Sequence, residues 1–312
     1  MKAKIIGTGS FLPEKRLSNY ELSTMVDTND EWIVTRTGIR ERRIADEVCV
    51  SDMALEAGLR AIDNAAVSPE SLEMIIVATS TQDYYFPNCA SRVQEKLGAQ
   101  NAACVDISAA CSGFIAALSM AQAYVEAGIY RRILVIGSEK MSDLVDWHDR
   151  SVCVLFGDGA GACVVSESDS ENDLSGIVSS DIHNDGKSGK VLTARTSSCI
   201  NMNGQEVFKF AVKKVPETIR HLLEKSETDI NDIKYFILHQ ANVRIIESVA
   251  KRLESDMEKF PRNIENYGNT SSASIPILLD ELNRQNKLCH GDLLILAGFG
   301  AGLSWGSILV RW

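Results

Sequence analysis

The sequence predicts an α/β protein built from two similar halves, and three observations support this prediction. Short apolar runs typical of buried strands alternate with longer segments that have the periodicity of amphipathic helices. Segments 71–81 and 232–242 each place a short acidic lead-in before an apolar strand, and 131–139 and 291–299 form a second related pair, again about 160 residues apart. An acidic, serine-rich stretch at 166–175 is typical of a solvated connector near the midpoint.

The first half is expected to contain five strands and three helices. Runs of Val, Ile and small residues predict strands at 4–9, 74–80, 102–108, 132–139 and 160–166. Apolar residues recurring every three or four positions predict helices at 51–66, 88–97 and 111–127. The last of these helices is followed by Gly128, a residue type common just after a helix.

The second half repeats this pattern. Strands are expected at 175–182, 235–242, 292–300 and 305–312, and helices at 206–225, 243–254 and 272–285. Two glycine-rich stretches, 156–165 and 297–307, lack the third glycine of G-x-G-x-x-G and lead into strands, so they do not indicate dinucleotide binding. We interpret them as tight turns at which the backbone approaches another group closely.

Composition excludes several classes of protein. A formal net charge of −10 argues against nucleic acid as the main partner, because phosphate binding needs a basic surface. No apolar run approaches the roughly 18 to 20 residues that span a bilayer, and the N-terminus reads as a first strand, so we expect a cytoplasmic protein. The eight cysteines include no C-x-x-C pair and no Cys/His cluster at zinc spacing, so we expect no metal site and structural thiols at seven of them.

The exception is Cys111, which lies between a predicted strand and a predicted helix in the run DISAACSGF. A helix N-terminus offers free backbone N–H groups and a positive dipole end, which stabilise a thiolate and lower the pKa of a thiol. The small neighbouring residues would leave room for a substrate carbonyl. The alternative is a buried cysteine that only packs in the core.

Two further residues are candidates for chemistry. His239 follows an apolar strand directly, at the strand end where α/β folds commonly place their sites, although a single histidine is more often structural. Asn269 lies in a turn-rich approach to a helix, where Asn commonly serves as a cap. The remaining histidines show no partner in the sequence: His148, His183, His221 and His290.

Cys111, His239 and Asn269 together have an order found in one family. The chain resembles the β-ketoacyl-[acyl-carrier-protein] synthase III family, the condensing enzymes that start bacterial fatty-acid synthesis. The resemblance covers essentially the whole chain and rests on seven stretches: GTGSFLPEKRLSNYEL, DEWIVTRTGIRERR, DISAACSGF, FGDGAGA, LHQANVRI, YGNTSSASIP and GAGLSWGSILVRW. It implies a thiolase-like fold of two similar halves, 1–170 with the cysteine and 171–312 with the histidine and asparagine. These halves form five layers, α-β-α-β-α, usually in a homodimer.

The resemblance also implies a ping-pong reaction. An acyl-CoA primer, for which acetyl-CoA is expected, and malonyl-[acyl-carrier protein] would give a 3-oxoacyl-carrier protein, CoA and CO₂. Cys111 would receive the acyl group as a thioester, while His239 and Asn269 donate hydrogen bonds to the enolate formed by decarboxylation. The N–H of Cys111 and that of Ala301 or Gly302 would bind the oxyanion. No cofactor is implied, because the coenzyme A thioester is a substrate.

Binding residues follow from the same resemblance. Trp32 and Arg150 would sandwich the adenine of coenzyme A, Arg36 would contact a phosphate and Asn242 the pantetheine arm. The acyl pocket would be formed by Phe86, which reaches across the dimer, with Met141 and Phe299. Pocket volume, and therefore primer length and branching, stays open. Ser151 stands where better-known members have glycine, which leaves the shape of the adenine pocket open.

An acidic carrier protein needs a basic surface on an acidic enzyme. Two predicted helices and the residue after His239 supply the candidates: Lys209, Lys213, Lys214, Gln240, Arg244, Lys251 and Arg252. The alternative for Lys213 and Lys214 is an ordinary solvated helix face with salt-bridging lysines.

Three other functions compete with condensation. A same-fold acyltransferase or a secondary-metabolite condensing enzyme would share the cysteine, but Asn269 favours enolate chemistry. A papain-like protease also has the order Cys–His–Asn, but here the C-G-[SA]-C-[WY] setting is missing. A non-catalytic module that binds the carrier protein is disfavoured, because all three reactive residue types are present.

Overall fold

The structure is a computed structural model that describes residues 2–168, 173–195 and 198–312. Its first sheet has the strand order β1-β7-β6-β4-β5. In that order the strands span Ala3–Phe11, Asp158–Glu167, Arg132–Lys140, Met74–Ala78 and Ala103–Ile107. β7 is antiparallel to both β1 and β6, whereas β6, β4 and β5 run parallel to one another.

The second sheet repeats this arrangement with four strands. Its order is β11-β12-β13-β8, and the strands span Ile233–Leu238, Leu293–Gly300, Ser304–Arg311 and Gly176–Asn184. β13 is antiparallel to β12 and β8, and β11 is parallel to β12. The related segments in the sequence therefore occupy equivalent places, β4 with β11 and β6 with β12. The expected internal repeat is confirmed.

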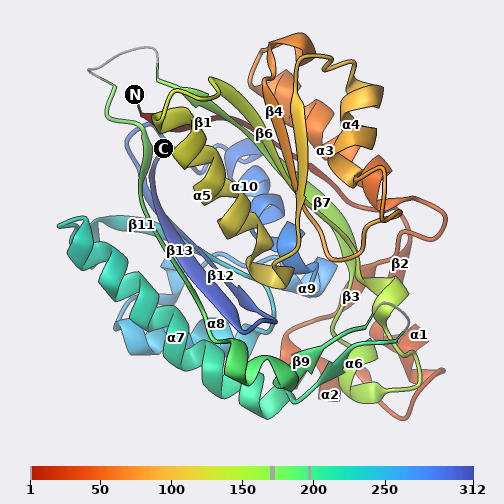
Figure 1. Cartoon of the computed structure of the whole chain (residues 1–312). Helices are drawn as coiled ribbons and strands as arrows, with labels where there is room; N and C mark the ends of the chain where they lie inside the picture. Colours follow the sequence, from red (N-terminus) through yellow and green to blue (C-terminus); the bar gives the residue numbers. More distant parts are fainter. Residues whose placement is uncertain (1, 169–172, 196–197) are drawn as a thin grey trace.

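Helices fill three layers around the two sheets (Figure 1). α5 (Gly113–Glu126) and α10 (Ser274–Arg284) contact strands of both sheets and form the middle layer. α3 (Val50–Asn64) and α4 (Cys89–Leu97) cover the outer face of the first sheet, and α7 (Gly204–Lys225) and α8 (Val243–Leu253) lie on the outer side of the second. α5 has no charged residue before Glu126, as suits a helix enclosed on two sides. The five-layer α/β fold is confirmed.

Short elements lie beside the layers. The remaining strands are β2 (Arg16–Ser18), β3 (Glu41–Arg43), β9 (Leu192–Thr193) and β10 (Asn201–Met202), and the remaining α-helices are α1 (Asn19–Ser23), α2 (Asp30–Thr37), α6 (Arg150–Cys153) and α9 (Ile264–Tyr267). The 3₁₀ turns are η1 (Pro69–Ser71), η2 (Ala110–Ser112), η3 (Met141–Leu144), η4 (Gly186–Val191), η5 (Ile230–Asp232), η6 (Met257–Lys259) and η7 (Ser271–Ala273). Side chains from α1, α2, η3 and α6 pack into a separate small core beside the main ones.

The element boundaries differ little from those expected. The strand expected at 235–242 ends at Leu238, so the residues from His239 to Asn242 lie in the turn that follows it. The predicted division at 170/171, and the middle of the connector 166–175, fall outside the described residues, so that division stays a prediction. No helix in the described ranges is both long enough and apolar enough to cross a membrane.

Candidate active site

Cys111, His239 and Asn269 line one cavity of about 1020 Å³, although they come from distant parts of the chain. Cys111 lies in η2, between β5 and α5; His239 directly follows β11; and Asn269 lies two residues before η7, the turn that leads into α10. The internal repeat brings equivalent ends of the two halves together at this point. The structure therefore unites the three residues that the sequence singles out.

Cys111 is closely surrounded by backbone and small side chains. A Cβ placed on Gly300 would lie 2.9 Å from the Cβ of Cys111 and 3.4 Å from its Sγ, so only glycine fits at that position. Gly298 approaches the carbonyl of Cys111 in the same way. The end of β12 is thus in close contact with η2. The glycines of the stretch 297–307 permit this contact, as expected from the sequence.

The expected lowering of the pKa of the Cys111 thiol is wrong. Burial raises the pKa of Cys111 to about 12, because a thiolate here would lose its hydration. A hydrogen bond from the Ser271 side chain opposes this rise in pKa, and the nearby Glu139 adds to it. Cys111 is 7% exposed, so removal from water outweighs the helix end behind the thiol.

His239 is a buried, neutral imidazole with a fixed orientation. Burial lowers its pKa to about 3, so the ring is uncharged at neutral pH. Its Nδ1 lies 2.6 Å from the hydroxyl oxygen of Ser274, and that oxygen also accepts a hydrogen bond from the backbone N–H of Gln240 at 3.4 Å. The Ser274 hydroxyl can donate its proton to Nδ1. In that arrangement the ring proton of His239 lies on Nε2, where it can act as a donor.

Asn269 is oriented by the turn that follows it. Its Oδ1 accepts a hydrogen bond from the backbone N–H of Ser271 at 2.9 Å, which fixes which end of the amide is oxygen. The Nδ2 group therefore points away from that N–H and can donate. The two residues expected to stabilise an enolate both present donors, which is the polarity that this role requires.

A buried carboxylate behind the thiol is a residue that the sequence reasoning missed. Glu139 ends the run RILVIGSE and accepts hydrogen bonds from the hydroxyls of Thr81 (2.7 Å), Ser271 (3.1 Å) and Ser272 (3.0 Å) and from the N–H of Ser80 (3.0 Å). Burial raises its pKa, and these hydrogen bonds oppose the rise. The run of serines in the stretch NTSSAS is the sequence feature that could have indicated this site. Their shared hydrogen-bond partner, Glu139, is more than 130 positions away in the chain, so the pairing was not apparent.

Three of the four residues expected to bind coenzyme A line the cavity: Trp32, Arg36 and Asn242. The Oδ1 of Asn242 accepts a hydrogen bond from the N–H of Arg244 at 2.9 Å and so caps the start of α8. The guanidinium of Arg150 lies 5.0 Å from the centroid of the Trp32 ring. An intercalated adenine would need about 7 Å, two contacts of about 3.5 Å each. The gap is therefore too small for an adenine, and the guanidinium of Arg150 packs directly on the Trp32 ring.

Most of the residues expected to form the acyl pocket and the oxyanion hole line the cavity, but Phe86 and Gly302 do not. Met141, Phe299, Ala301 and Cys111 line the cavity, and Phe299 packs edge-to-face against His239 with ring centroids 5.2 Å apart. Gly302 is not among the lining residues, which favours Ala301 as the second oxyanion donor. Phe86 is 85% exposed and contributes nothing to the cavity of the single chain.

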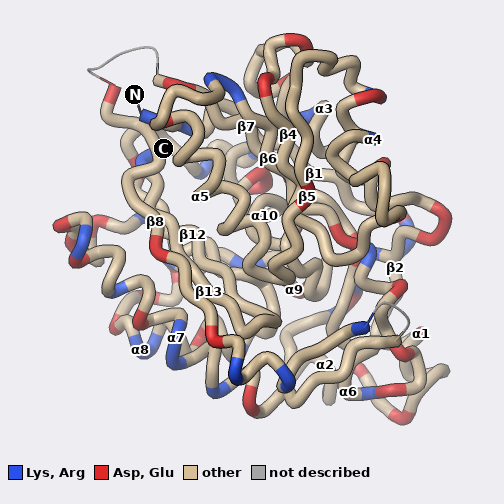
Figure 2. The backbone as a smooth tube through the Cα atoms, in the orientation of Figure 1, with Lys and Arg blue, Asp and Glu red and all other residues tan. Residues whose placement is uncertain are grey.

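The residues expected to dock the carrier protein lie on α7 and α8, with one correction. Gln240 is 1% exposed, and its side chain donates to the carbonyl of Leu238 and accepts from the N–H of Asn263, so it cannot belong to a docking surface. Figure 2 shows charges of both signs on the two helices. Lys209 pairs with Glu206 and Lys214 with Glu217, both at 2.7 Å. Within the described residues no ion pair is formed by Lys213, Arg244, Lys251 or Arg252.

A thiol that shares one cavity with two hydrogen-bond donors, at the junction of two thiolase-like halves, defines a condensing acyltransferase. Comparison with known proteins gives the same class. Residues 105–186 match the family model for 3-oxoacyl-[acyl-carrier-protein (ACP)] synthase III, and residues 223–312 match the model for its C-terminal part. The chain belongs to the β-ketoacyl-[acyl-carrier-protein] synthase III family.

Individual relatives agree over the full length. The chain is 46% identical to the β-ketoacyl-[acyl-carrier-protein] synthase III of Clostridium acetobutylicum, over 99% of this chain and 98% of the relative. It is 47% identical to that of Aquifex aeolicus, with complete coverage of both. The crystal structure of the Aquifex aeolicus VF5 synthase III superimposes with a TM-score of 0.97 at 47% identity, covering 99% of this chain and 100% of the other.

Proposed function

We propose that the protein condenses an acyl-CoA primer, with acetyl-CoA expected, and malonyl-[acyl-carrier protein] to a 3-oxoacyl-carrier protein at the start of fatty-acid synthesis. The observation that carries this proposal is a pair of hydrogen-bond donors that line the same cavity as Cys111. His239 is neutral and donates through Nε2 when Ser274 donates to its Nδ1, and the Nδ2 group of Asn269 can donate. Both suit an oxygen that becomes negative, and neither suits the removal of a proton.

The reaction proceeds in two steps, acylation of Cys111 and then condensation. The Cys111 sulfur attacks the acyl-CoA carbonyl, the C–S bond to coenzyme A breaks, and the thiol proton ends on the departing CoA sulfur. In the second step malonyl-carrier protein loses CO₂, and the electron pair of the broken C–C bond forms an enolate that accepts hydrogen bonds from His239 and Asn269. The enolate carbon then attacks the acyl-Cys111 carbonyl, whose oxyanion is bound by the N–H groups of Cys111 and Ala301. The Cys111 sulfur leaves as a thiolate and takes up one proton from water.

The same observation weighs against the two main alternatives. In a papain-like protease the imidazole must accept the thiol proton, but burial lowers the pKa of His239 to about 3, which makes this ring a weak proton acceptor. A same-fold acyltransferase that transfers the acyl group to an alcohol or amine forms no enolate and has no use for a second oriented donor at Asn269.

Binding of coenzyme A to Trp32, Arg36, Arg150 and Asn242 is part of the proposal. Adenine stacking requires Arg150 to rise from the Trp32 ring, which breaks the hydrogen bond it donates to the Asp27 carbonyl at 2.7 Å. Arg36 lies on the same ring, 4.6 Å from its centroid, where a phosphate can reach its guanidinium. No cofactor is proposed for the condensation itself.

The assembly is proposed to be a cytoplasmic homodimer. Tyr84, Tyr85 and Phe86 form consecutive aromatic residues that are 52%, 71% and 85% exposed in the single chain. A second subunit that covers them would carry Phe86 to the acyl pocket of its neighbour. Lys213, Arg244, Lys251 and Arg252 on α7 and α8 are the proposed contacts for the acidic carrier protein.

The test separates the two half-reactions in one variant. Asn269→Ala should still load Cys111 from acetyl-CoA, because no enolate forms at that position during loading. Its release of CO₂ from malonyl-carrier protein should fall about 100- to 1000-fold, the cost of removing one donor from a developing oxyanion. Single-turnover acylation and CO₂ release are measured separately, with the exposed Asn266→Ala as the matched control. Normal CO₂ release in Asn269→Ala, or equal losses in both half-reactions, would contradict the assignment.

A further inference from the structure

A cluster of two imidazoles and one carboxylate lies on the outer side of the second sheet, away from the cavity. Asp181 and His183 are two residues apart on β8, so their side chains project from the same face of the strand. His221 comes from α7, which packs against β8 and β13. The carboxylate of Asp181 lies between the two rings: one oxygen is 2.9 Å from Nε2 of His183, and the other is 3.0 Å from Nδ1 of His221.

The three groups are close enough to share one ion. Their ligand atoms all lie within 4.8 Å of one another. Tetrahedral zinc with nitrogen and oxygen ligands at about 2.0 to 2.2 Å separates those ligands by about 3.4 Å, so small side-chain rotations suffice. The two present N–H···O contacts are the bonds that an ion would replace. Both rings are accessible, 44% for His183 and 58% for His221, which leaves room for water as a further ligand.

Neighbouring groups already orient two of these side chains. Asp181 is 8% exposed and accepts a hydrogen bond from the Thr218 hydroxyl at 2.6 Å, and Thr218 in turn contacts the Ser307 hydroxyl at 3.1 Å. The ring of His183 stacks on Trp305 with centroids 5.5 Å apart and planes 23° apart. Partners of this kind, behind the ligands, are typical of metal centres, because they fix each ligand before the ion binds.

We propose that Asp181, His183 and His221 form a binding site for a divalent transition-metal ion, with zinc as the occupant. Imidazole nitrogen favours zinc, cobalt, nickel and copper over magnesium and calcium, which prefer all-oxygen shells. Two neutral rings and one carboxylate leave a positive charge on the bound ion, as in zinc sites that keep an open position. None of the three residues lines the cavity that contains Cys111, so this site is distinct from the condensation site.

The stacking of His183 on Trp305, one of four tryptophans in the chain, gives a readout that does not depend on activity. Chelator-treated protein is titrated with Co²⁺, a paramagnetic probe expected to quench Trp305 fluorescence when it binds beside it, and Zn²⁺ is then added to displace it. We expect one equivalent to bind, quenching to reach saturation, and zinc to reverse it. Absence of saturable quenching, or a cobalt–thiolate absorption band showing that a cysteine is the ligand, would overturn the proposal.

Variants assign the ligands. His183→Gln and His221→Gln should each weaken Co²⁺ and Zn²⁺ binding by more than the about 10- to 100-fold expected for Thr218→Val, which removes only an outer partner. His290→Gln, at an exposed histidine elsewhere, is the matched control and should bind as the parent does. Circular dichroism without metal checks that each variant folds. Unchanged affinity in both His183→Gln and His221→Gln would show that the triad serves only as hydrogen bonds that fasten α7 to β8.

Discussion

Two opposing effects act on the Cys111 thiol. The start of α5 stabilises negative charge, but enclosure by η2, Gly300 and Ser271 removes the water that a thiolate needs, and enclosure is the larger effect. The resting enzyme therefore carries a thiol. Its sulfur becomes nucleophilic only as its proton leaves, a property that protects it from oxidation between turnovers.

Reactivity at Cys111 should keep rising at high pH. Because burial raises the pKa of this thiol to about 12, the rate constant for its alkylation by iodoacetamide should increase about tenfold per pH unit beyond pH ~9. A free cysteine derivative in solution, whose thiol has a pKa of about 8.5, should level off near pH ~9. Peptide mass spectrometry follows alkylation of Cys111 beside this reference thiol in one sample. A plateau for Cys111 at the same pH as the reference thiol would contradict the burial argument.

Ser274 is expected to act through His239. Ser274→Ala removes the hydroxyl that directs the ring proton to Nε2, so the donor tautomer loses its preference and CO₂ release from malonyl-carrier protein should fall about 10-fold or more. Acyl loading of Cys111 should change much less. Ser274→Thr, which keeps the hydroxyl, should recover most of the rate. Equal rates of CO₂ release in the parent and Ser274→Ala would remove this tautomer control.

At the scale of elements, the sequence predicted the long helices and the sheet strands but not the pieces around the cavity mouth. All six predicted helices exist, because each has an apolar stripe several turns long. α2 was not predicted as a helix: it spans only eight residues, of which Ile33 and Thr37 are buried, too few to show a period. It forms because Asn29 caps its start and Gly38 ends it in a left-handed conformation.

Glu139 joins two segments that shape the cavity, the one at Ser80–Thr81 and the turn at Ser271–Ser272. Every partner donates to this carboxylate, so Glu139→Gln would place an NH₂ group against donors and leave about 1 to 3 kcal/mol of unsatisfied polar contact. We expect a lower melting temperature and a loss in both half-reactions, because Ser271 contacts both the thiol and Asn269. The exposed Glu254→Gln serves as control. Unchanged melting temperature and acylation rate in Glu139→Gln would contradict this role.

For the molecule as a whole, the repeat explains why three residues could be recognised and their neighbours could not. Cys111, His239 and Asn269 stand in distinctive stretches at the ends of equivalent elements, so order along the chain was informative. Their partners Glu139 and Ser271 are 132 positions apart, and the pairing exists only once both halves are packed. The sign of the thiol pKa shift also depended on packing, which no local pattern reports.

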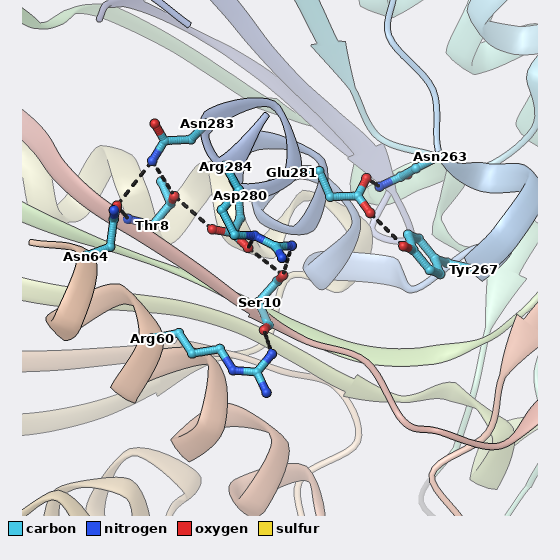
Figure 3. A network of polar contacts seen from close by, with 10 residues as sticks. All are labelled: Thr8, Ser10, Arg60, Asn64, Asn263, Tyr267, Asp280, Glu281, Asn283 and Arg284. Atoms are coloured by element: carbon cyan, nitrogen blue, oxygen red, sulfur yellow. Dashed lines mark hydrogen bonds and ion pairs between the residues drawn. The ribbon is translucent and has the colours of Figure 1, made fainter. Parts of the chain in front are cut away.

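Polar contacts as well as apolar ones join the two halves, and Figure 3 shows the main network. On α10, Asp280 accepts hydrogen bonds from Thr8 (2.9 Å) and Ser10 (2.6 Å) on β1 and pairs with Arg284 at 2.9 Å. The Asn283 side chain donates to Asn64 of α3 at 3.1 Å. The middle-layer helix from the second half is thus fastened to the first sheet by a carboxylate that is 1% exposed.

Removing the Asp280 carboxylate should lower the free energy of unfolding of the whole chain without changing the residues of the active site. Asp280→Ala leaves the buried hydroxyls of Thr8 and Ser10 without their acceptor, which costs about 1 to 3 kcal/mol for each hydroxyl. Arg284→Ala, whose side chain is 59% exposed, removes only the charged partner at the rim and should cost about 1 kcal/mol or less. Urea unfolding followed by both tryptophan fluorescence and circular dichroism measures each loss. Because the network spans both halves, the two probes should shift together. Separate transitions in Asp280→Ala would show that each half unfolds on its own, and a loss no larger than that of Arg284→Ala would show that apolar packing alone joins them.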